Sequence, residues 1–419
     1  MSRVLMMTAA WPPVGRVGAR RPLRLARRLE QHGWTPIVLT PDPESEPFYR
    51  APSLDHSLTE PDVEVHRVPA LFPGVKARRL LDQVGASKAP KATFIAQRII
   101  DGLQLPDHIV EWSLAARRRA RALGPVDVVW ATGGPWGLLV AAGVVARALD
   151  RPLVLDYRDP WTVAPKVFSK NPLKMPAPVY RWMEGQLLGQ ARAVSYVYRD
   201  NLERNQKVFG QPEGTHWQVI PNGFDPLDLP DGEAIKPERP TLIYAGSCYE
   251  SRSMKPILEA LHAGFPGDPS EGLQLKVFGE LDPPAKQFLD AHPLGERVKI
   301  MGRIPAHDLA GHLKGADGLL VITGEQHKRA IAAKIFDYLL AGRPMLSYGP
   351  PGSDAEDLLH RCGAGRWVNS GDQTALIEAL KAVERRDLDF DPKPEEIARH
   401  SADAMTAEMA SLLRFAAHN

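Results

Sequence analysis

Cysteine is scarce in this sequence, which has only Cys248 and Cys362 among its 419 residues. Two thiols at unrelated spacing supply neither a disulfide framework nor a Cys/His zinc cluster. We therefore expect no metal site, and the pattern fits a reducing compartment.

Long apolar runs are also missing. Nowhere do 18 uninterrupted apolar residues occur, and the apolar run at the start of the chain is too short for a signal peptide. No period of 20 to 50 residues repeats, which disfavours a solenoid or propeller. We expect a cytoplasmic protein that is soluble or peripheral on the inner face of the membrane.

The net charge is small, at +2, but it is unevenly distributed. Residues 1–225 contain 30 Lys and Arg against 21 Asp and Glu, whereas the remainder contains 22 against 29. A basic half suits an anionic partner or an anionic membrane surface, and the alternative is that the opposite charges serve solubility and complementary domain faces. No basic patch interleaved with aromatic residues accompanies the charge, so nucleic acid is not an expected partner.

The chain is too long for one ordinary domain, and its 44% apolar content can form two cores. Short apolar segments alternate with helical patterns, which predicts an α/β fold with parallel sheets. Four prolines between residues 226 and 240 mark a linker. We predict two Rossmann-like domains facing a cleft: residues 1–225, with a last helix over 396–419 packing back on it, and residues 226–395.

The first predicted loop contains Gly15 and Gly18, between a strand over 4–8 and a helix that stops at Gly33. Glycines there bring backbone amides close to a ligand at a helix N-terminus, although a tight turn alone would also explain them. The spacing is not G-x-G-x-x-G, and no acidic residue ends the second strand where a ribose would bind. Dinucleotide binding is therefore disfavoured.

Two later loops also follow predicted strands of the first domain. One contains Gly133 and Gly134, and the other begins Asp156-Tyr157-Arg158-Asp159. Ligands of parallel sheets gather at the carboxyl ends of strands, and charged groups there need partners. Either Arg158 pairs with Asp156 while Asp159 caps a helix, or Asp159 is the polar group of a binding site and is oriented by Arg158.

A basic segment lies between residues 76 and 121, where apolar residues recur at helical spacing. Its cations are Lys76, Arg78, Arg79, Lys88, Lys91, Arg98, Arg117, Arg118, Arg119 and Arg121. A basic amphipathic helix could lie on an anionic membrane or hold an anionic acceptor. A merely solvated helical face is the alternative.

The stretch over 322–346 reads as a strand end, a polar loop, a helix and a following strand. Lys334 and Asp337 are three residues apart and share one helix face, and Gly342 ends the helix. A lysine in the first turn is poorly placed against the helix dipole, so it is better explained if a phosphate shares the site. The alternative is a solvated lysine and aspartate on a surface helix.

Residues 332–346, AAKIFDYLLAGRPML, resemble the donor-site signature of nucleotide-sugar glycosyltransferases with the two-Rossmann GT-B fold, in particular the retaining family four. Residues 156–161 resemble the Phe-Arg-Asp-Pro-Trp motif of a bacterial branch of these enzymes, and residues 219–225 resemble the Pro-Asn-Gly-x-Asp segment that ends their first domain. Two departures stand out. Asp337 lies where Glu is usual, and Arg329 lies where the Glu-x7-Glu motif has its first carboxylate.

The resemblance implies a role for each motif. Lys334 and Arg252 would bind and neutralise the departing diphosphate, and Asp337 would hold the ribose hydroxyls. Asp159, oriented by Arg158, would act at the acceptor hydroxyl or the donor sugar. Other implied nucleotide contacts are Gly15, Gly18, Gly246, Arg303, Ile304, Glu325 and Ile335, and the implied acceptor contacts are Arg16, Gly133, Gly134 and Asp159.

Two positions differ from what is frequent in the family. Ser247 occupies a place where a basic residue is frequent, and Glu325 and His327 are the nearest substitutes for the missing carboxylate.

The implied reaction is transfer of a hexosyl group from a nucleoside diphosphate sugar to the hydroxyl of a sugar or lipid-linked acceptor. The resemblance further implies anomeric retention, a place in cell-surface glycan or glycolipid assembly, and no cofactor or metal beyond the donor. The alternatives are a nucleotide-sugar epimerase or pseudo-glycosyltransferase on the same fold, a natural-product glycosyltransferase, and a non-catalytic binding partner of glycan assembly.

Overall fold

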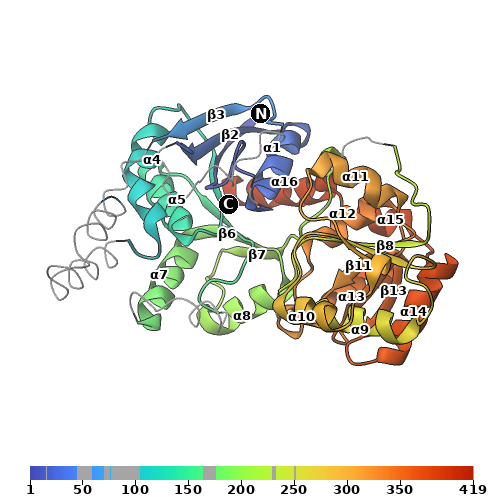
Figure 1. The fold of residues 1–419 in the computed structure, drawn as a ribbon. Helices are drawn as coiled ribbons and strands as arrows, with labels where there is room; N and C mark the ends of the chain where they lie inside the picture. The colour runs from blue at the N-terminus through green and yellow to red at the C-terminus, as the bar shows by residue number, and fades with distance from the viewer. Residues whose placement is uncertain are drawn as a thin grey trace. The chain divides into compact units, whose positions relative to one another are not determined.

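The computed structural model describes residues 1–15, 17–44, 59–69, 76, 104–163, 176–228, 233–249 and 252–418. The chain divides into two compact units, of which unit 1 comprises residues 1–221 and 405–419 and unit 2 comprises residues 222–404. Each unit is a parallel β-sheet with helices on both faces (Figure 1). The predicted α/β class is therefore confirmed.

The sheet of unit 1 has seven parallel strands in the order β3-β2-β1-β4-β5-β6-β7. The order reverses between β1 and β4, and the carboxyl ends of strands flanking such a reversal are where ligands bind in open α/β sheets. The strands are β1 (Ser2–Met7), β2 (Trp34–Pro41), β3 (Glu64–Val68), β4 (Val128–Thr132), β5 (Leu153–Tyr157), β6 (Ala191–Tyr196) and β7 (His216–Val219).

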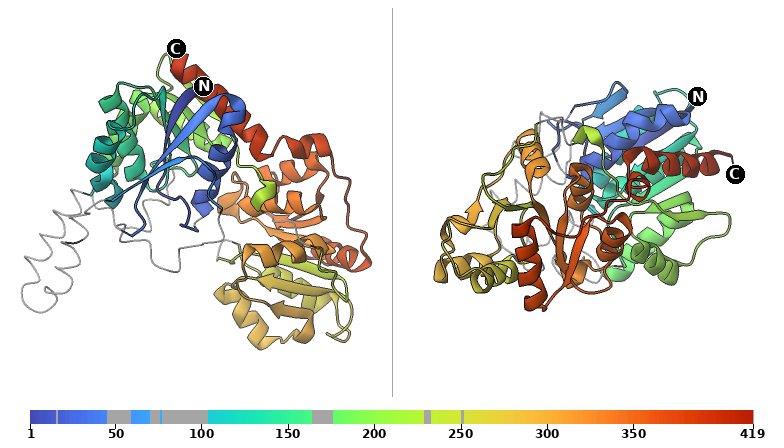
Figure 2. Two further views of the ribbon diagram at one scale, coloured as in Figure 1. Left: turned by 90° about the horizontal axis from the view of Figure 1, so that it is seen from above. Right: turned by 90° about the vertical axis from the view of Figure 1, so that its right-hand side faces the viewer.

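Both faces of this sheet are covered. Leu5 and Met7 of β1 belong to a core with α4, α5 and α7, whereas Val4 and Met6 point into a second core with α1 and α16. Figure 2 shows the blue α1 and the red α16 on the same side of the sheet. Because both faces are buried, the strands are almost continuously apolar. The helices are α1 (Val17–Arg28), α4 (Ser113–Ala120), α5 (Trp136–Leu149), α7 (Ala177–Gln190), α8 (Arg199–Phe209) and α16 (Ala402–His418).

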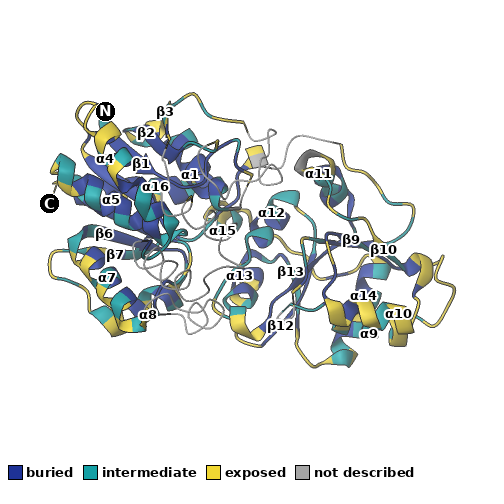
Figure 3. Ribbon diagram, turned by 60° about the vertical axis from the view of Figure 1, so that its left-hand side comes forward, coloured by how far each residue is buried: buried dark blue, intermediate teal, exposed yellow. Residues whose placement is uncertain are grey.

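The sheet of unit 2 has six parallel strands in the order β10-β9-β8-β11-β12-β13, with its reversal between β8 and β11. Figure 3 shows the inner strands of this sheet as mostly buried, whereas the edge strands β10 and β13 are mostly half-buried. The strands are β8 (Thr241–Ala245), β9 (Gln274–Phe278), β10 (Val298–Ile300), β11 (Gly318–Ile322), β12 (Met345–Gly349) and β13 (Gly365–Asn369).

Helices α9, α10 and α14 cover one face of the second sheet, and α11, α12 and α13 cover the other. The helix α12 ends at Gly342, whose φ of 66° is the left-handed conformation expected of a glycine that stops a helix. The helices are α9 (Lys255–Gly264), α10 (Pro283–Ala291), α11 (Ala306–Gly315), α12 (Ala333–Ala341), α13 (Asp354–Cys362), α14 (Gln373–Arg385) and α15 (Pro394–Ala398).

The boundary between the units lies at Pro221, four residues before the predicted position. The reason is a pairing within unit 2: the N–H of Phe224 donates to the carbonyl of His400 at 2.9 Å, and the N–H of Ala402 donates back to the carbonyl of Phe224 at 2.7 Å. The second boundary lies at Met405, inside α16, whereas the prediction placed it at residue 396; α15 and the first residues of α16 belong to unit 2.

Most of the predicted basic segment lies outside the described residues, which contain from it Lys76 and residues 104–121. Within that part, α4 carries Arg117, Arg118 and Arg119 near its C-terminus. Among the described residues, no helix is both long and apolar enough to cross a membrane.

Candidate active site

Lys334 lies in the first turn of α12, and its amino group is 3.6 Å from the centroid of the Tyr244 ring on β8. This cation–π contact brings a charge against an apolar surface. Burial lowers the pKa of Lys334 to about 7; the nearby Cys248 and Asp337 favour its charged form, whereas Arg252 disfavours it. Lys334 is thus poised to gain a proton when an anion arrives.

Gly246 makes room for this lysine. Its φ is 121°, which side chains rarely adopt, and a Cβ at this position would lie 3.1 Å from the amino group of Lys334. Both observations require glycine at the end of β8. The sequence predicted Gly246 as a nucleotide contact, and the structure brings it against Lys334.

Arg252 follows the same loop, where its N–H donates to the carbonyl of Tyr249 at 2.7 Å. Its Nε is shielded from solvent and has no hydrogen-bond partner among the described residues. A shielded guanidinium donor without a partner is costly unless a ligand satisfies it, and a phosphate or carboxylate oxygen is the natural acceptor.

Arg303 reaches this loop from the turn after β10. Its Nη2 lies 3.3 Å from the hydroxyl of Ser247, and its Nε lies 3.4 Å from a carboxylate oxygen of Glu280. Arg252 thus lies in the loop between β8 and α9, and Lys334 and Arg303 approach this loop from α12 and from the turn after β10. Three cations near one backbone turn form a site for a multiply charged anion.

The remaining predicted nucleotide contacts are placed differently from one another. Asp337 is partly exposed on α12, Ile304 is partly buried, and Glu325 is exposed in a short 3-10 helix after β11. Ile335 is 2% exposed in the core, and its N–H donates to the carbonyl of Ala332 at 3.0 Å. The side chain of Ile335 lies in the core, so its position does not support the predicted nucleotide contact.

Arg329, which replaces the carboxylate of the signature, is held by α13. Its Nη1 lies 3.0 Å from Asp354, and the N–H of Asp354 donates to the carbonyl of Lys328 at 2.9 Å. These contacts fasten the loop before α12 to the start of α13. In this chain, residue 329 contributes to loop anchoring.

In unit 1, Asp156 is fully buried and is satisfied by four donor atoms. Two come from the guanidinium of Arg21, both at 2.9 Å, and the others are the hydroxyls of Thr132 at 2.8 Å and Ser195 at 2.7 Å. The partner of Asp156 is thus Arg21 on α1, and the alternative of an Asp156–Arg158 pair is wrong. The sequence contained no local signal for this pairing, since the two residues are 135 positions apart.

Arg158 instead donates to the carbonyls of Gly133 at 2.9 Å and Gly134 at 2.7 Å. A Cβ on Gly18 would overlap its Nη1, so the first residues of α1 also require glycine here. Burial lowers the pKa of Arg158, and the neighbouring Asp159 partly offsets this. The structure therefore brings together Gly18, Gly133, Gly134 and Arg158.

Asp159 is exposed, and one carboxylate oxygen lies 3.9 Å from where a Cβ on Gly134 would be. Among the described residues it has no hydrogen bond, so it is available to a ligand. Gly15 is exposed in the loop before α1, and Arg16 lies outside the described residues.

Glu184 was not anticipated from the sequence. This residue of α7 is fully buried, and one carboxylate oxygen accepts hydrogen bonds from the N–H and the hydroxyl of Thr162. Burial raises the pKa of Glu184 to about 7. The adjacent Trp161 stacks on Trp136 at 5.5 Å between ring centroids. Together these contacts hold the segment that carries Asp159.

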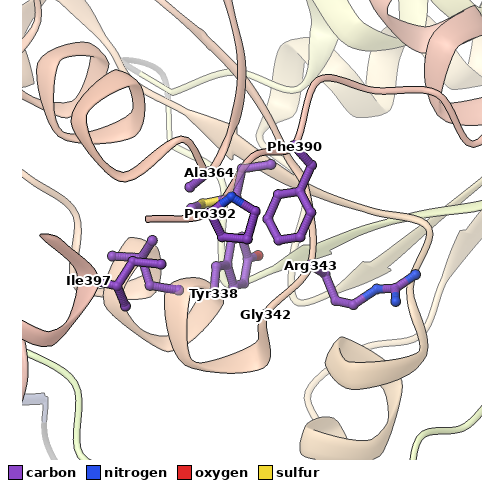
Figure 4. A pocket seen from close by; sticks show the side chains of 9 residues that line it. Tyr338, Gly342, Arg343, Ala364, Phe390, Pro392 and Ile397 are labelled. Carbon is purple, nitrogen blue, oxygen red and sulfur yellow. The ribbon is translucent and has the colours of Figure 1, made fainter. Parts of the chain in front are cut away.

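A small cavity of about 120 Å³ lies elsewhere in unit 2, at the C-terminal end of α12 (Figure 4). None of its nine lining residues is a predicted site residue. Among the described residues, no group of His, Cys, Asp and Glu is arranged to hold a metal ion.

Residues 18–223 match the sequence family described as Glycosyl transferase 4-like domain. The chain is a glycosyltransferase. The matched region covers most of unit 1 and includes Gly18, Gly133, Gly134, Arg158 and Asp159. No curated protein gave a significant match to the chain.

Solved structures similar to this glycosyltransferase extend over its whole length. Sucrose-phosphate synthase from Thermosynechococcus elongatus is 15% identical with a TM-score of 0.62, and the alignment covers 99% of this chain and 98% of that one. Anabaena HepE in complex with UDP and glucose is 14% identical with a TM-score of 0.61, over 99% and 100%. The lipopolysaccharide outer core galactosyltransferase WaaB is 11% identical with a TM-score of 0.54, over 99% of both chains. At these identities the likeness establishes the fold, which is GT-B.

Proposed function

We propose that this glycosyltransferase transfers a hexosyl group from a nucleoside diphosphate sugar to the hydroxyl of a sugar or lipid-linked acceptor, with retention of anomeric configuration. The observation that carries the proposal is the meeting of Lys334, Arg252 and Arg303 at the loop after β8. This loop lies where the strand order of unit 2 reverses, which is the usual ligand position in such sheets.

The cations suit the chemistry of the donor. As the glycosidic bond to the diphosphate breaks, negative charge grows on the departing phosphate, and preorganised positive groups stabilise that charge. Lys334 and the unsatisfied Nε of Arg252 would supply this stabilisation, so no metal is included in the proposal. Asp337, one turn further along α12, would accept hydrogen bonds from the ribose hydroxyls, and Ile304 would contact the base.

On unit 1, Asp159 would act at the acceptor hydroxyl or the donor sugar. It is exposed, whereas Asp156 three residues earlier is fully buried. Arg158, held by the carbonyls of Gly133 and Gly134, fixes the backbone from which Asp159 projects. In the sugar-binding loop of unit 2, the exposed Glu325 would replace the carboxylate lost at residue 329.

Similar structures support the class of donor and acceptor. HepE has been solved with UDP and glucose and with UDP-glucose, and WaaB is described as a lipopolysaccharide galactosyltransferase. We therefore propose assembly of a cell-surface glycan or glycolipid as the pathway, and UDP-glucose and UDP-galactose as the first donors to test. Residues 156–161 fit the bacterial branch named above.

A surface glycan acceptor would require a cytoplasmic enzyme at the inner face of the membrane. On α4 the side chain of Leu114 is 71% exposed, and Arg118 and Arg121 are exposed close by in sequence. An apolar group among arginines suits an anionic bilayer, where each cation contributes on the order of 1 kcal/mol and less at high salt. Sedimentation with anionic liposomes at low and high salt tests this; binding that ignores salt would contradict it.

The function itself is tested by incubating the chain with each donor and a panel of saccharide and lipid-linked acceptors. Product formation with nucleoside diphosphate release is the expected outcome, and proton NMR of the first product gives its anomeric configuration. Lys334→Ala should abolish transfer, whereas Arg361→Ala, an exposed arginine paired with Asp357 on α13, should leave it unchanged. Release of the epimerised free sugar nucleotide, or no turnover of any donor, would overturn the proposal.

A further inference from the structure

The carboxyl ends of β8, β9 and β10 lie side by side, because the three strands are parallel neighbours in the sheet of unit 2. Ser247, Glu280 and Arg303 follow these three strands in that order. The N–H of Cys248 donates to the carbonyl of Glu280 at 2.8 Å, which fastens the first loop to the second. Arg303 then extends across the second loop to the hydroxyl of Ser247.

Ser247 is uncharged and follows Gly246 in the chain. The amino group of Lys334 packs against Gly246. Consecutive Cα atoms are about 3.8 Å apart. Arg303 and Lys334 therefore contact neighbouring residues of the same loop, and Arg303 comes to it from the turn after β10.

The contacts that now hold Arg303 are weak enough to be exchanged. Its side chain is 73% exposed and that of Glu280 is 65% exposed, and ion pairs between such groups contribute little. The hydrogen bond to Ser247 is long, at 3.3 Å. An incoming phosphate could thus recruit the guanidinium without breaking a strong interaction.

We infer that Arg303 binds the diphosphate of the donor and makes the site selective for nucleoside diphosphates over monophosphates. This inference rests on the proposed function and gives Arg303 a specific part in it, contact with the diphosphate. Two phosphates carry more charge than one and extend further along the loop, so a third cation at Ser247 favours the longer anion.

The test measures affinities by isothermal titration calorimetry. UDP, GDP, ADP and dTDP are titrated into the unchanged chain, and the tightest of them and its monophosphate are then titrated into variants. Arg303→Ala should weaken the diphosphate about tenfold and the monophosphate less than twofold. The matched control Arg361→Ala, again an exposed arginine with a carboxylate partner, should change neither.

A rescue variant gives the sharper result. Ser247→Lys combined with Arg303→Ala returns a cation to the same loop and should recover at least threefold of the lost diphosphate affinity. Failure of that recovery, an equal loss for both nucleotides, or no loss at all would each overturn the inference while leaving the proposed function intact. Binding of none of the four diphosphates by the unchanged chain would overturn the proposed function and this inference together.

Discussion

Raising the pH above neutrality should weaken nucleoside diphosphate binding, because the binding lysine loses its proton. Burial lowers the pKa of Lys334 to about 7, and the nearby Arg252 adds to this. Binding should weaken with rising pH because the ammonium form of Lys334 is the one that attracts phosphate. This charge is present below pH 7 and is lost as the pH rises through 7. The diphosphate, whose last ionisation lies near pH 6, is already charged in this range.

The magnitude follows from the populations of the two forms. With a pKa of about 7, Lys334 is roughly half protonated at pH 7 and about 1% protonated at pH 9. If only the ammonium form binds, affinity falls about 50-fold between these values, or roughly 2 kcal/mol. Burial also raises the pKa of the neighbouring Cys248 thiol, so Lys334 is the group expected to respond.

Calorimetry in two buffers with different ionisation enthalpies measures both quantities. Binding should take up about half a proton at pH 7 and close to one at pH 8.5, since the bound phosphate keeps Lys334 charged. Lys334→Arg is the control, because a guanidinium stays protonated throughout and should remove the dependence. An affinity that changes less than twofold from pH 7 to 9, or an equal decline in Lys334→Arg, would refute the reasoning.

Four further outcomes are expected. Arg252→Ala should weaken diphosphate binding by about 1.5–3 kcal/mol in calorimetry, without changing the Tm of the ligand-free protein. Asp337→Asn should raise the KM of a ribose donor and leave that of a 2′-deoxyribose donor less affected; equal losses would remove the ribose contact. Asp159→Asn should lower kcat at least tenfold while donor affinity stays within twofold, and an unchanged kcat would contradict its role. Glu184 has a folded pKa of about 7 against an ordinary 4.5, so its stabilising contribution is complete below pH 4.5 and is lost as the pH rises through 7. Between pH 4.5 and 8, the free energy of unfolding of Glu184→Gln, measured in urea, should therefore rise by on the order of 3 kcal/mol relative to that of the unchanged chain. A pH-independent difference between the two unfolding free energies would argue against a titrating carboxyl.

Much of the fold could be predicted from local patterns. The alternation of apolar segments and helical patterns predicted the α/β class, and α12 ends at Gly342 as expected, because periodicity and a helix-stopping glycine are local signals. The sequence likewise indicated Lys334 as a phosphate ligand, since a cation at a helix N-terminus is unexplained without one.

What could not be predicted depends on residues far apart in the chain. Nothing near Arg21 indicates that it pairs with Asp156, and the charged pattern at the strand end therefore suggested Arg158 as the partner. The approach of Arg303 to Ser247 likewise depends on the order of β8, β9 and β10, which local patterns do not give.

Because Asp156 is buried and Asp159 is exposed, loss of either carboxylate should lower the total activity of a cell extract, but for different reasons. Removing the carboxylate at 156 takes away one partner of a buried ion pair with Arg21, which is expected to cost about 3–5 kcal/mol, a large part of the stability of a typical domain. Less folded protein would then accumulate in the cell, at normal turnover per molecule. Removing the exposed carboxylate at 159 should leave abundance unchanged and reduce turnover instead. Activity per molecule of folded enzyme would thus distinguish the two: it should stay normal for substitutions at residue 156 and fall for substitutions at residue 159.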